Sequence, residues 1–370
     1  MDRKQTVLLT GGGTLGSVTP LLAIARAWRA RDPEVSFIWV GTPDGPEARL
    51  VEREGIPFIP FNAPKAPRYL SWRWLTLPFE LCRALWHAIR LLFEYQPAWI
   101  LSAGAYVSVP LVWCAPFAGA KVAIHQLDVP LSLSNRLMLP MADLVTTTWS
   151  ETAKSIKKPV HVVGSPVYDR GVSVRSREDI LMHFDLDPTL GTVLVLGGGT
   201  GSVALNAMME SIAMDLAREA NVIHVTGKDK RMFVTGHQPG NYRTFGLLEE
   251  DLMDALRVAD VVVTRAGLGT MGELVLEGKA AIFVPLPHSP QVANARAVSD
   301  RSAGYVLEER TWTRELLLET IRKALEPHKR HELEERMAHL FPVKGVAETV
   351  VELVLAKEAR GGKDVLKRLQ

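Results

Sequence analysis

Cysteine is scarce in this sequence, with only two in 370 residues. Cys82 and Cys114 both stand in apolar surroundings, which argues against a disulfide framework and against a cysteine zinc site. An excess of charge of one sign is also missing: the formal net charge is +2, so nothing draws the whole chain toward nucleic acid. Residues 1–5 lead directly into an apolar stretch and leave no room for the apolar part of a signal peptide. We therefore expect a reducing cytoplasmic setting and no nucleic-acid partner.

Uninterrupted hydrophobic runs of membrane-spanning length are missing as well. Residues 96–120 contain no charged residue and would be long enough to cross a bilayer. Prolines and glycines interrupt this segment, however, and residues 98–102 are typical of a buried parallel strand followed by a turn. We interpret the segment as part of a folded α/β domain.

The sequence also lacks the residue spacings of metal sites. Its ten histidines are scattered along the chain, without a zinc-type cluster. Asp185 and Asp187 have the spacing of a carboxylate pair, but they precede Pro188, and a turn is the better interpretation. The sequence therefore predicts no bound metal.

Two segments repeat one local pattern. Residues 7–14 and 193–200 each consist of an apolar run, three glycines and a threonine. The apolar run indicates a buried strand, and the glycines let the backbone turn tightly and present its N–H groups to a phosphate at the start of a helix. Two such loops at matched positions predict two Rossmann-like halves facing a common cleft. A chain of 370 residues with 47% hydrophobic content has enough apolar material for two cores.

Apolar runs alternate with helix-length segments along the whole chain, which predicts βαβ units and parallel sheets, hence an α/β fold in each half. We expect an N-terminal domain over 1–164, a C-terminal domain over 165–345, and a helical tail over 346–370 that packs back on the first domain. Strands are expected at 6–10, 35–40, 57–61, 98–102, 121–125, 143–147, 160–163, 192–196, 221–226, 242–245, 260–263, 280–284 and 303–306.

Residues 63–95 combine basic side chains with tryptophans, as segments at membrane surfaces do. One interpretation is a helix mostly buried against the first sheet with solvated charges on its outer face. The other is lipid contact, for which 67–74 is the better candidate. A polar stripe at helical spacing is formed by Glu80, Arg83, His87, Arg90 and Glu94.

Segment 261–295 carries the richest chemistry. A strand ends at Arg265, small residues turn the chain, and a helix follows with Glu273 in its first turns. A helix N-terminus suits a diphosphate, and a carboxylate one turn further suits a ribose diol. The alternative is that Glu273 only complements the helix dipole. Beyond the next strand, Gln291 and Asn294 carry amide groups suited to a sugar.

Several motifs, in order along the chain, resemble those of the MurG-type glycosyltransferases, which attach N-acetylglucosamine to the membrane-bound muramyl-pentapeptide precursor of peptidoglycan. The resemblance to the family's three glycine loops lies in GGGTLGSVTPLLAIA (11–25), GAYVSVP (104–110) and LGGGTGSVALN (196–206). Further similar segments are VAIHQLDVPLSLSNR (122–136), the hinge GSPV (164–167) and the donor-binding stretch TRAGLGTMGE (264–273).

This resemblance implies a GT-B fold and an inverting transfer of N-acetylglucosamine from UDP-N-acetylglucosamine to undecaprenyl-diphosphate-muramyl-pentapeptide. It implies no cofactor, the UDP-sugar held mainly by the C-terminal domain, and the lipid acceptor held by the N-terminal domain at the cytoplasmic face of the membrane. By position it assigns Gly246 to uracil, Glu273 to ribose and Gln291 to the sugar. The other implied donor-binding residues are Thr14, Leu15, Gly16, Asp128, Gly199, Arg265, Leu268, Gly269, Thr270, Met271 and Gly272.

The sequence departs from the family pattern where the base would be. The family's histidine in the first glycine loop, a leading candidate for that base, is Ser17 here, and a serine is not a proton acceptor near neutral pH. We take Asp128 as the replacement base and His125 as the second candidate, beside a purely structural role for His125. The family's glutamate is Gln126 and its arginine after the hinge is Tyr168.

These changes leave alternatives open. One is a related transferase that acts on another lipid acceptor, such as a diacylglycerol, since the changed residues lie mostly on the acceptor side. Another is a UDP-N-acetylglucosamine epimerase of similar two-domain shape, or a nucleotide-sugar binder without catalysis.

Overall fold

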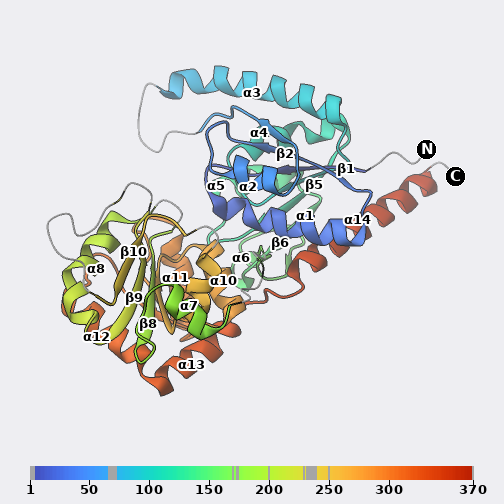
Figure 1. Ribbon diagram of the computed structural model, residues 1–370. Helices are drawn as coiled ribbons and strands as arrows, with labels where there is room; N and C mark the ends of the chain where they lie inside the picture. The colour runs from blue at the N-terminus through green and yellow to red at the C-terminus, as the bar shows by residue number, and fades with distance from the viewer. Residues whose placement is uncertain are drawn as a thin grey trace. The chain divides into compact units, whose positions relative to one another are not determined.

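The computed structural model describes residues 5–65, 73–168, 171, 175–198, 201–227, 230, 240–248 and 251–368. The chain forms two compact units: Met1–Tyr168 with Pro342–Gln370, and Asp169–Phe341 (Figure 1). Each unit contains a parallel sheet with helices on both faces. The α/β fold predicted for both halves of the sequence is confirmed.

The sheet of the first unit has the order β3-β2-β1-β4-β5-β6-β7, and the pairs are parallel. Its strands are β1 (Thr6–Thr10), β2 (Ser36–Gly41), β3 (Phe58–Pro60), β4 (Trp99–Ser102), β5 (Lys121–Gln126), β6 (Leu144–Thr147) and β7 (His161–Val162). The helices and 3-10 turns are η1 (Leu15–Ser17), α1 (Thr19–Arg31), α2 (Glu47–Arg53), α3 (Arg73–Tyr95), α4 (Ser108–Cys114), η2 (Ala115–Ala118), α5 (Leu133–Met138), η3 (Leu139–Met141), α6 (Ser150–Ala153) and α14 (Val346–Arg368).

Alternate residues of these strands fill a core on each face of the sheet. Leu8 and Ile100 are fully buried in one cluster, together with Ala88 and Leu92 of α3. Helices α1 and α14 pack along each other and cover the other face (Figure 1). Helix α3 therefore has one buried side, and its remaining surface faces away from the sheet.

The C-terminal segment belongs to the first unit. Gln5 Nε2 donates to both carboxylate oxygens of Glu358 (2.9 Å each). Where the chain returns, the Ser165 amide donates to the Pro342 carbonyl (2.9 Å). Gly164 has a φ of 95°, and a Cβ there would lie 2.1 Å from the Pro342 oxygen, so this crossing requires glycine.

The sheet of the second unit has the order β10-β9-β8-β11-β12-β13, again with parallel pairs. Its strands are β8 (Gly191–Leu196), β9 (Ala220–Val225), β10 (Tyr242–Phe245), β11 (Val261–Thr264), β12 (Ala280–Phe283) and β13 (Tyr305–Val306). Its helices are α7 (Arg177–His183), α8 (Val203–Leu216), α9 (Leu252–Val258), α10 (Leu268–Glu277), α11 (Gln291–Asp300), α12 (Arg314–Leu325) and α13 (Pro327–Ala338).

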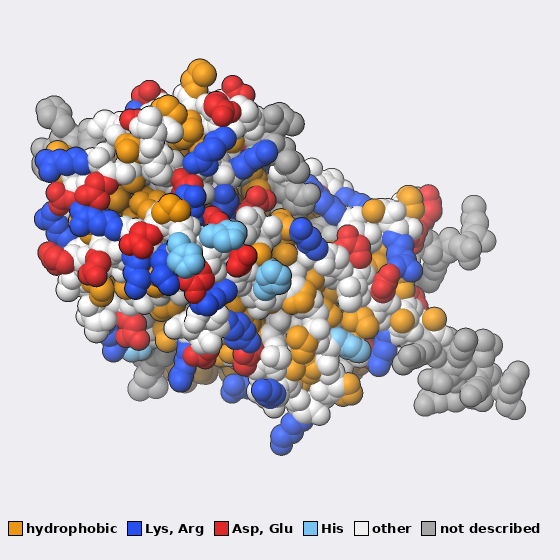
Figure 2. All heavy atoms as spheres, turned by 90° about the horizontal axis from the view of Figure 1, so that it is seen from below, with side chains coloured by type: hydrophobic (Ala, Val, Ile, Leu, Met, Phe, Trp, Pro, Cys, Tyr) orange, Lys and Arg blue, Asp and Glu red, His pale blue; other side chains and the backbone are white. Residues whose placement is uncertain are grey.

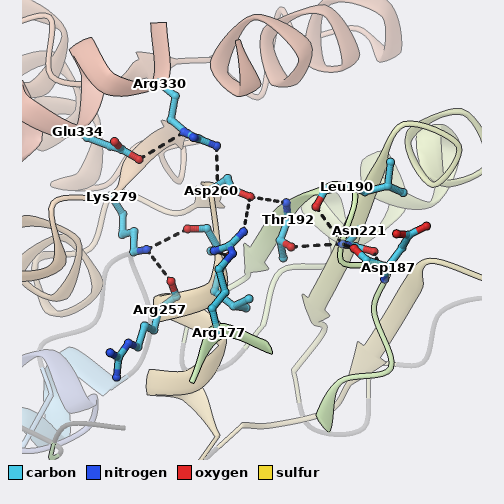
Figure 3. A network of polar contacts seen from close by, with 12 residues as sticks. Arg177, Asp187, Leu190, Thr192, Asn221, Arg257, Asp260, Lys279, Arg330 and Glu334 are labelled. Atoms are coloured by element: carbon cyan, nitrogen blue, oxygen red, sulfur yellow. Dashed lines mark hydrogen bonds and ion pairs between the residues drawn. The ribbon is translucent and has the colours of Figure 1, made fainter. Parts of the chain in front are cut away.

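A carboxylate at the amino end of β11 joins this sheet to two helices (Figure 3). Asp260 Oδ2 accepts from the Thr192 amide (2.8 Å) and from Arg177 of α7 (3.1 Å), and its Oδ1 accepts from Arg330 of α13 (2.8 Å). Nearby, Lys279 Nζ donates to the carbonyls of Arg257 and Ala259 at the C-terminal end of α9. These contacts fix the scaffold at the amino ends of the strands, the edge opposite to the one where doubly wound sheets bind ligands.

The surface is mixed in charge. Figure 2 shows basic and acidic side chains interspersed over the face seen from below, in keeping with a net charge of +2. Within the described ranges, no helix combines the length and apolar character needed to cross a membrane.

The outer face of α3 carries the expected solvated charges, with Arg83, Arg90 and Glu94 exposed, and large apolar side chains are exposed beside them. Leu75, Phe79 and Trp86 are 78%, 79% and 60% exposed, and Arg90 lies over the Trp86 ring at 4.8 Å. Most of the segment 67–74, expected as the better lipid contact, lies outside the described residues.

Candidate active site

The carboxyl ends of the strands in the second sheet bring together the segments predicted to bind the donor. Strand β8 leads into the third glycine loop, β10 into Gly246, β11 into Arg265, and β12 into the loop that ends at Gln291. In parallel α/β sheets this edge is where ligands bind. Gly199 lies outside the described residues.

Helix α10 begins at this edge, and its N-cap residue forms no side-chain hydrogen bond to the helix. Its N-cap residue, Gly267, is extended (φ −86°, ψ 139°), and the Met271 amide is bonded to the Gly267 carbonyl (3.0 Å). The amides of Leu268, Gly269 and Thr270 come before that bond, so they point out of the helix end. Such a helix end favours an anion such as a diphosphate.

The carboxylate and amides predicted for the sugar nucleotide flank this helix end. Glu273 is half-buried in the second turn of α10. Gln291 opens α11, and its Oε1 accepts from the Leu286 amide (2.9 Å). Its Nε2 lies 3.9 Å from the position of a Cβ at Gly267, so the amide is held beside the end of α10. Asn294, by contrast, is fully buried and donates to the Ala266 carbonyl (3.1 Å), which fixes the turn.

Arg265 connects three segments at this edge of the sheet. Its guanidinium is buried and donates to the Val284 carbonyl (3.0 Å), the Glu309 carboxylate (2.5 Å) and the Ser202 hydroxyl (2.5 Å). Ser202 is the N-cap of α8, directly after the third glycine loop. Arg265 therefore holds that loop against the end of β12, a positioning role that the sequence pattern did not reveal.

Two glycines of the third loop, Gly197 and Gly201, have no room for a side chain. Gly198 and Gly201 have φ values of 80° and 69°, and a Cβ at Gly201 would lie 2.3 Å from the Thr226 carbonyl oxygen. The loop backbone thus lies directly against the end of β9. Gly246 is exposed at the end of β10. A Cβ at this position would lie 3.9 Å from the Gly227 carbonyl oxygen.

In the first unit, a buried carboxylate supports the first glycine loop. Glu47 is fully buried, and its oxygens accept from the Thr42 amide (2.7 Å), the Thr42 hydroxyl (2.5 Å) and the Gly13 amide (3.3 Å). A Cβ at Gly12 would lie 2.1 Å from Glu47 Oε1, which explains the glycine there. Sequence reasoning missed Glu47, because a glutamate at the start of a short helix is ordinarily solvated.

The residues expected at the tip of this loop differ in exposure. Thr14 is exposed, Leu15 and Gly16 are half-buried, and Ser17 is buried. The Ser17 hydroxyl donates to the Thr14 carbonyl (3.4 Å), a contact within the loop.

Gln126 shapes the loop that carries Asp128. Its Nε2 donates to the carbonyls of Asp128 (2.8 Å) and Pro130 (3.0 Å). Its Oε1 accepts from Asn135 Nδ2 (2.6 Å) and from the Ser132 amide (3.3 Å). The neutral glutamine thus holds the turn after β5, and the Asp128 side chain is half-buried on it.

The second base candidate, His125, is buried. Its Nδ1 lies 2.9 Å from the Thr146 hydroxyl, and its Nε2 lies 3.4 Å from the Thr148 hydroxyl. Burial lowers the pKa of His125 to about 3. Both ring nitrogens are engaged inside the domain, which favours the structural role over the catalytic one.

Tyr168, where the family pattern has arginine, also has an internal role. Its hydroxyl donates to the Glu54 carboxylate (2.5 Å) and accepts from Arg26 (2.7 Å). The hydrogen bond from Arg26 keeps the pKa of Glu54 below its usual value. Tyr168 thereby attaches the end of the first unit's main segment to α1 and α2.

The burial of two histidines should make the folded protein less stable in acid. His224 pairs with the Tyr242 hydroxyl (2.7 Å) and Asn206 Oδ1 (3.1 Å), and burial lowers its pKa to about 3, as for His125. In the unfolded chain a histidine has a pKa near about 6.5. The free energy of unfolding therefore keeps its full value above that pH and decreases as the pH falls toward 3. We expect each histidine to cost about 2 kcal/mol of unfolding free energy between pH 7.5 and 5.

Urea denaturation at pH 7.5 and pH 5 measures this effect. His224→Gln should reduce the difference between the two pH values, whereas His161→Gln, at an exposed position, should leave it unchanged. An unchanged difference in His224→Gln would contradict the assignment.

No group of three or more histidine, cysteine or acidic side chains suited to a metal occurs among the described residues. Asp187, considered as part of a carboxylate pair, accepts from the Thr189 amide (2.8 Å) and hydroxyl (2.7 Å). This is the contact pattern of a turn.

Comparison with known proteins covers both units. The N-terminal domain of glycosyltransferase family 28 matches residues 7–147, and its C-terminal domain matches residues 192–350. Proteins named UDP-N-acetylglucosamine--N-acetylmuramyl-(pentapeptide) pyrophosphoryl-undecaprenol N-acetylglucosamine transferase are similar over most of the chain. The one from Clostridium perfringens is 30% identical over 328 residues, covering 86% of this chain and 90% of the relative. The one from Lachnospira eligens is 31% identical over 325 residues, with the same shares.

The crystal structure of Acinetobacter baumannii MurG is similar in fold, with a TM-score of 0.73 and 24% identity over 96% of this chain and 100% of that one. The matched domains and the similarity over most of the chain agree with the two parallel sheets described above. The chain therefore belongs to glycosyltransferase family 28 and has the GT-B fold.

Proposed function

We propose that this protein transfers N-acetylglucosamine from UDP-N-acetylglucosamine to a polyprenyl-diphosphate-linked muramyl-pentapeptide, with inversion at the anomeric carbon. The observation that carries the proposal is the gathering of the donor-binding stretch, Arg265 to Glu273 with Gln291, at the carboxyl edge of the second sheet of a family 28 chain.

Different donor-binding residues contact different parts of the nucleotide sugar. The exposed backbone at Gly246 suits the uracil edge, and the Glu273 carboxylate suits the ribose diol, from which it accepts two hydrogen bonds. The first amides of α10 and the third glycine loop, including Gly199, receive the diphosphate. Gln291, held beside the same helix end, contacts the sugar.

The remaining assignments belong to the first unit. Thr14, Leu15 and Gly16 contact the donor from the first glycine loop. Asp128 accepts the proton of the acceptor hydroxyl as that oxygen attacks the anomeric carbon. The bond from the anomeric carbon to the UDP oxygen breaks in the same step, and the helix dipole stabilises the charge that develops on the diphosphate. A direct displacement of this kind inverts the configuration and needs no metal or cofactor.

A panel of acceptors tests the proposal. The purified protein is incubated with UDP-N-acetylglucosamine and either a short-chain muramyl-pentapeptide diphosphate lipid, a diacylglycerol, or no acceptor, with UDP release and product mass followed. A disaccharide lipid from the muramyl acceptor supports the proposal. Product from the diacylglycerol alone, or isomerised UDP-sugar without an acceptor, would assign the protein to one of the alternatives.

The acceptor is a membrane lipid, so we also propose peripheral attachment at the cytoplasmic membrane face through the outer side of α3. Leu75, Phe79, Trp86 and Phe93 are spaced by three to four residues or multiples of these, so they share one face of the helix, and Arg83 and Arg90 lie among them. Exposed aromatic and basic side chains together favour the interface of an anionic bilayer.

Loss of this apolar face should release the protein from membranes. We expect Leu75→Ser combined with Phe79→Ser to lower partitioning onto vesicles of anionic phospholipid about 10- to 100-fold, because two exposed apolar side chains lose their burial in lipid. Vesicle co-sedimentation measures the partitioning. A matched double variant, Met182→Ser with Leu316→Ser, removes two exposed apolar side chains from the second unit and should bind as the original protein does. Equal binding by both double variants would contradict attachment through α3.

A further inference from the structure

The first unit contains an open hollow of about 610 Å³ that none of the roles above uses. Its apolar wall is formed by the segment after Asp128, by η3, and by the segment after α6: Val129, Pro130, Leu131, Leu139, Pro140 and Ile156. The volume falls within the range of about 300–1,000 Å³ that is common for small-molecule pockets.

Basic side chains line the same hollow. Arg136, Lys157 and Lys158 are exposed there, against one carboxylate, Glu151. Lys158 donates to the carbonyls of Pro140 (3.0 Å) and Ala142 (2.9 Å), so it also orders the wall. An apolar hollow with an excess of positive charge fits an amphiphile that has an anionic head group.

The hollow is continuous with the loop of the proposed base. Thr152 Oγ1 donates to the carbonyls of Asp128 (3.4 Å) and Val129 (2.7 Å), which ties this wall to the end of α6. The Asp128 side chain and the apolar wall therefore belong to one fixed loop. A ligand in the hollow lies next to the residue that is proposed to take the acceptor's proton.

The elements that supply Arg136 and Leu139 to the hollow also carry exposed apolar side chains. Leu133 and Leu137 of α5 are 60% and 40% exposed, and Met141 of η3 is 39% exposed. Trp113 Nε1 donates to the Leu137 carbonyl (2.9 Å), which connects α5 to α4, and α4 packs against α3. The hollow thus shares α5 and η3 with exposed apolar side chains.

We propose that this hollow binds the isoprenoid units of the acceptor that lie next to its diphosphate, with Arg136 and Lys157 contacting the diphosphate. This inference rests on the proposed function, because it names where that function's lipid acceptor is held. The short segment of chain in the hollow would be drawn out of the bilayer, and the rest of the lipid would remain in it.

Chain-length dependence tests the proposal. Leu131→Asn makes the apolar wall polar, so the KM for a long-chain muramyl acceptor should rise about tenfold. The KM for an acceptor with a single isoprene unit should stay within about twofold, since that chain makes little use of the wall. Lys157→Glu should raise the KM about fivefold for both acceptors, because both carry the diphosphate. The KM for UDP-N-acetylglucosamine should not change in either variant.

Matched controls separate these effects from general damage. Lys154→Glu reverses an exposed lysine near the same helix end that does not line the hollow, and Leu316→Asn changes an exposed leucine of the second unit. Both should leave every KM unchanged. Equal effects of Leu131→Asn on long and short acceptors, or no effect on either, would overturn the proposal.

Direct binding distinguishes this proposal from the proposed function. Equilibrium dialysis with radiolabelled geranylgeranyl diphosphate should show binding that Leu131→Asn weakens about tenfold. Such binding without sugar transfer would contradict the proposed function and leave the hollow as a lipid site. Sugar transfer with no dependence on Leu131 or Lys157 would contradict the lipid site and leave the proposed function.

Discussion

Asp128→Asn is expected to lower kcat about 10²- to 10⁴-fold, the range that a general base contributes. The amide keeps the size of the side chain but does not accept a proton near neutral pH. The loop should keep its shape, because Gln126 and Thr152 bind the backbone carbonyl of Asp128. The KM for UDP-N-acetylglucosamine should change much less than kcat.

Steady-state UDP release with a muramyl acceptor measures both constants. Asp300→Asn, at an exposed position of α11 in the second unit, is the control and should behave as the original protein. The acidic limb of the pH profile of kcat/KM should disappear in Asp128→Asn. A kcat within about twofold of the original would show that another group takes the proton.

The second large effect concerns the donor. Glu273→Gln is expected to lower kcat/KM for UDP-N-acetylglucosamine about 10- to 100-fold, because a carboxylate that accepts from a diol is worth about 1.5–3 kcal/mol. Glutamine keeps one acceptor oxygen and places an NH₂ group against a hydroxyl donor. Most of the loss should fall on the donor KM if the ribose contact is equal in the ground state and the transition state.

A double-mutant cycle with the 2′-deoxyribose donor isolates that contact. The original protein should discriminate between the two donors, and Glu273→Gln should lose most of this discrimination. Glu277→Gln, one turn further along α10 and exposed, is the matched control. Full discrimination retained by Glu273→Gln would mean that Glu273 serves only the helix.

The strands were predictable because both sheets are parallel and covered on both faces. Most central strands are therefore short apolar runs such as Val193–Leu196, and the expected positions match the strands of the structure within a few residues. The donor stretch was predictable because glycines and a carboxylate follow β11 in a fixed order. What these patterns indicate is local: a strand, a turn and a helix start.

The supporting contacts could not be predicted, because they join residues distant in sequence. Glu47 reaches Gly13 across 34 positions, and Arg265 reaches Ser202 across 63. Both are charged residues of types that usually lie at the surface, and only tertiary packing buries them here. The exposed apolar side chains of α3 were not predicted for a related reason: the sequence showed the polar stripe, but it did not distinguish the apolar residues beside that stripe from those packed on the sheet.

In the structure, the residues that depart from the family pattern have internal contacts of their own. Ser17 donates within the first loop, Gln126 holds the turn after β5 without a negative charge, and Tyr168 bonds the end of the first unit's main segment to α1 and α2. Asp128 then remains as the carboxylate proposed for the base.

Product identity tests the central claim most directly. UDP-N-acetylglucosamine labelled with carbon-13 at the anomeric position is incubated with the purified protein and a muramyl-pentapeptide diphosphate lipid, and the product is examined by NMR. The account predicts the label in a β-linked disaccharide on the muramyl lipid, the configuration opposite to that of the donor. Label retained in the α configuration, or found only in an isomerised UDP-sugar, would contradict it.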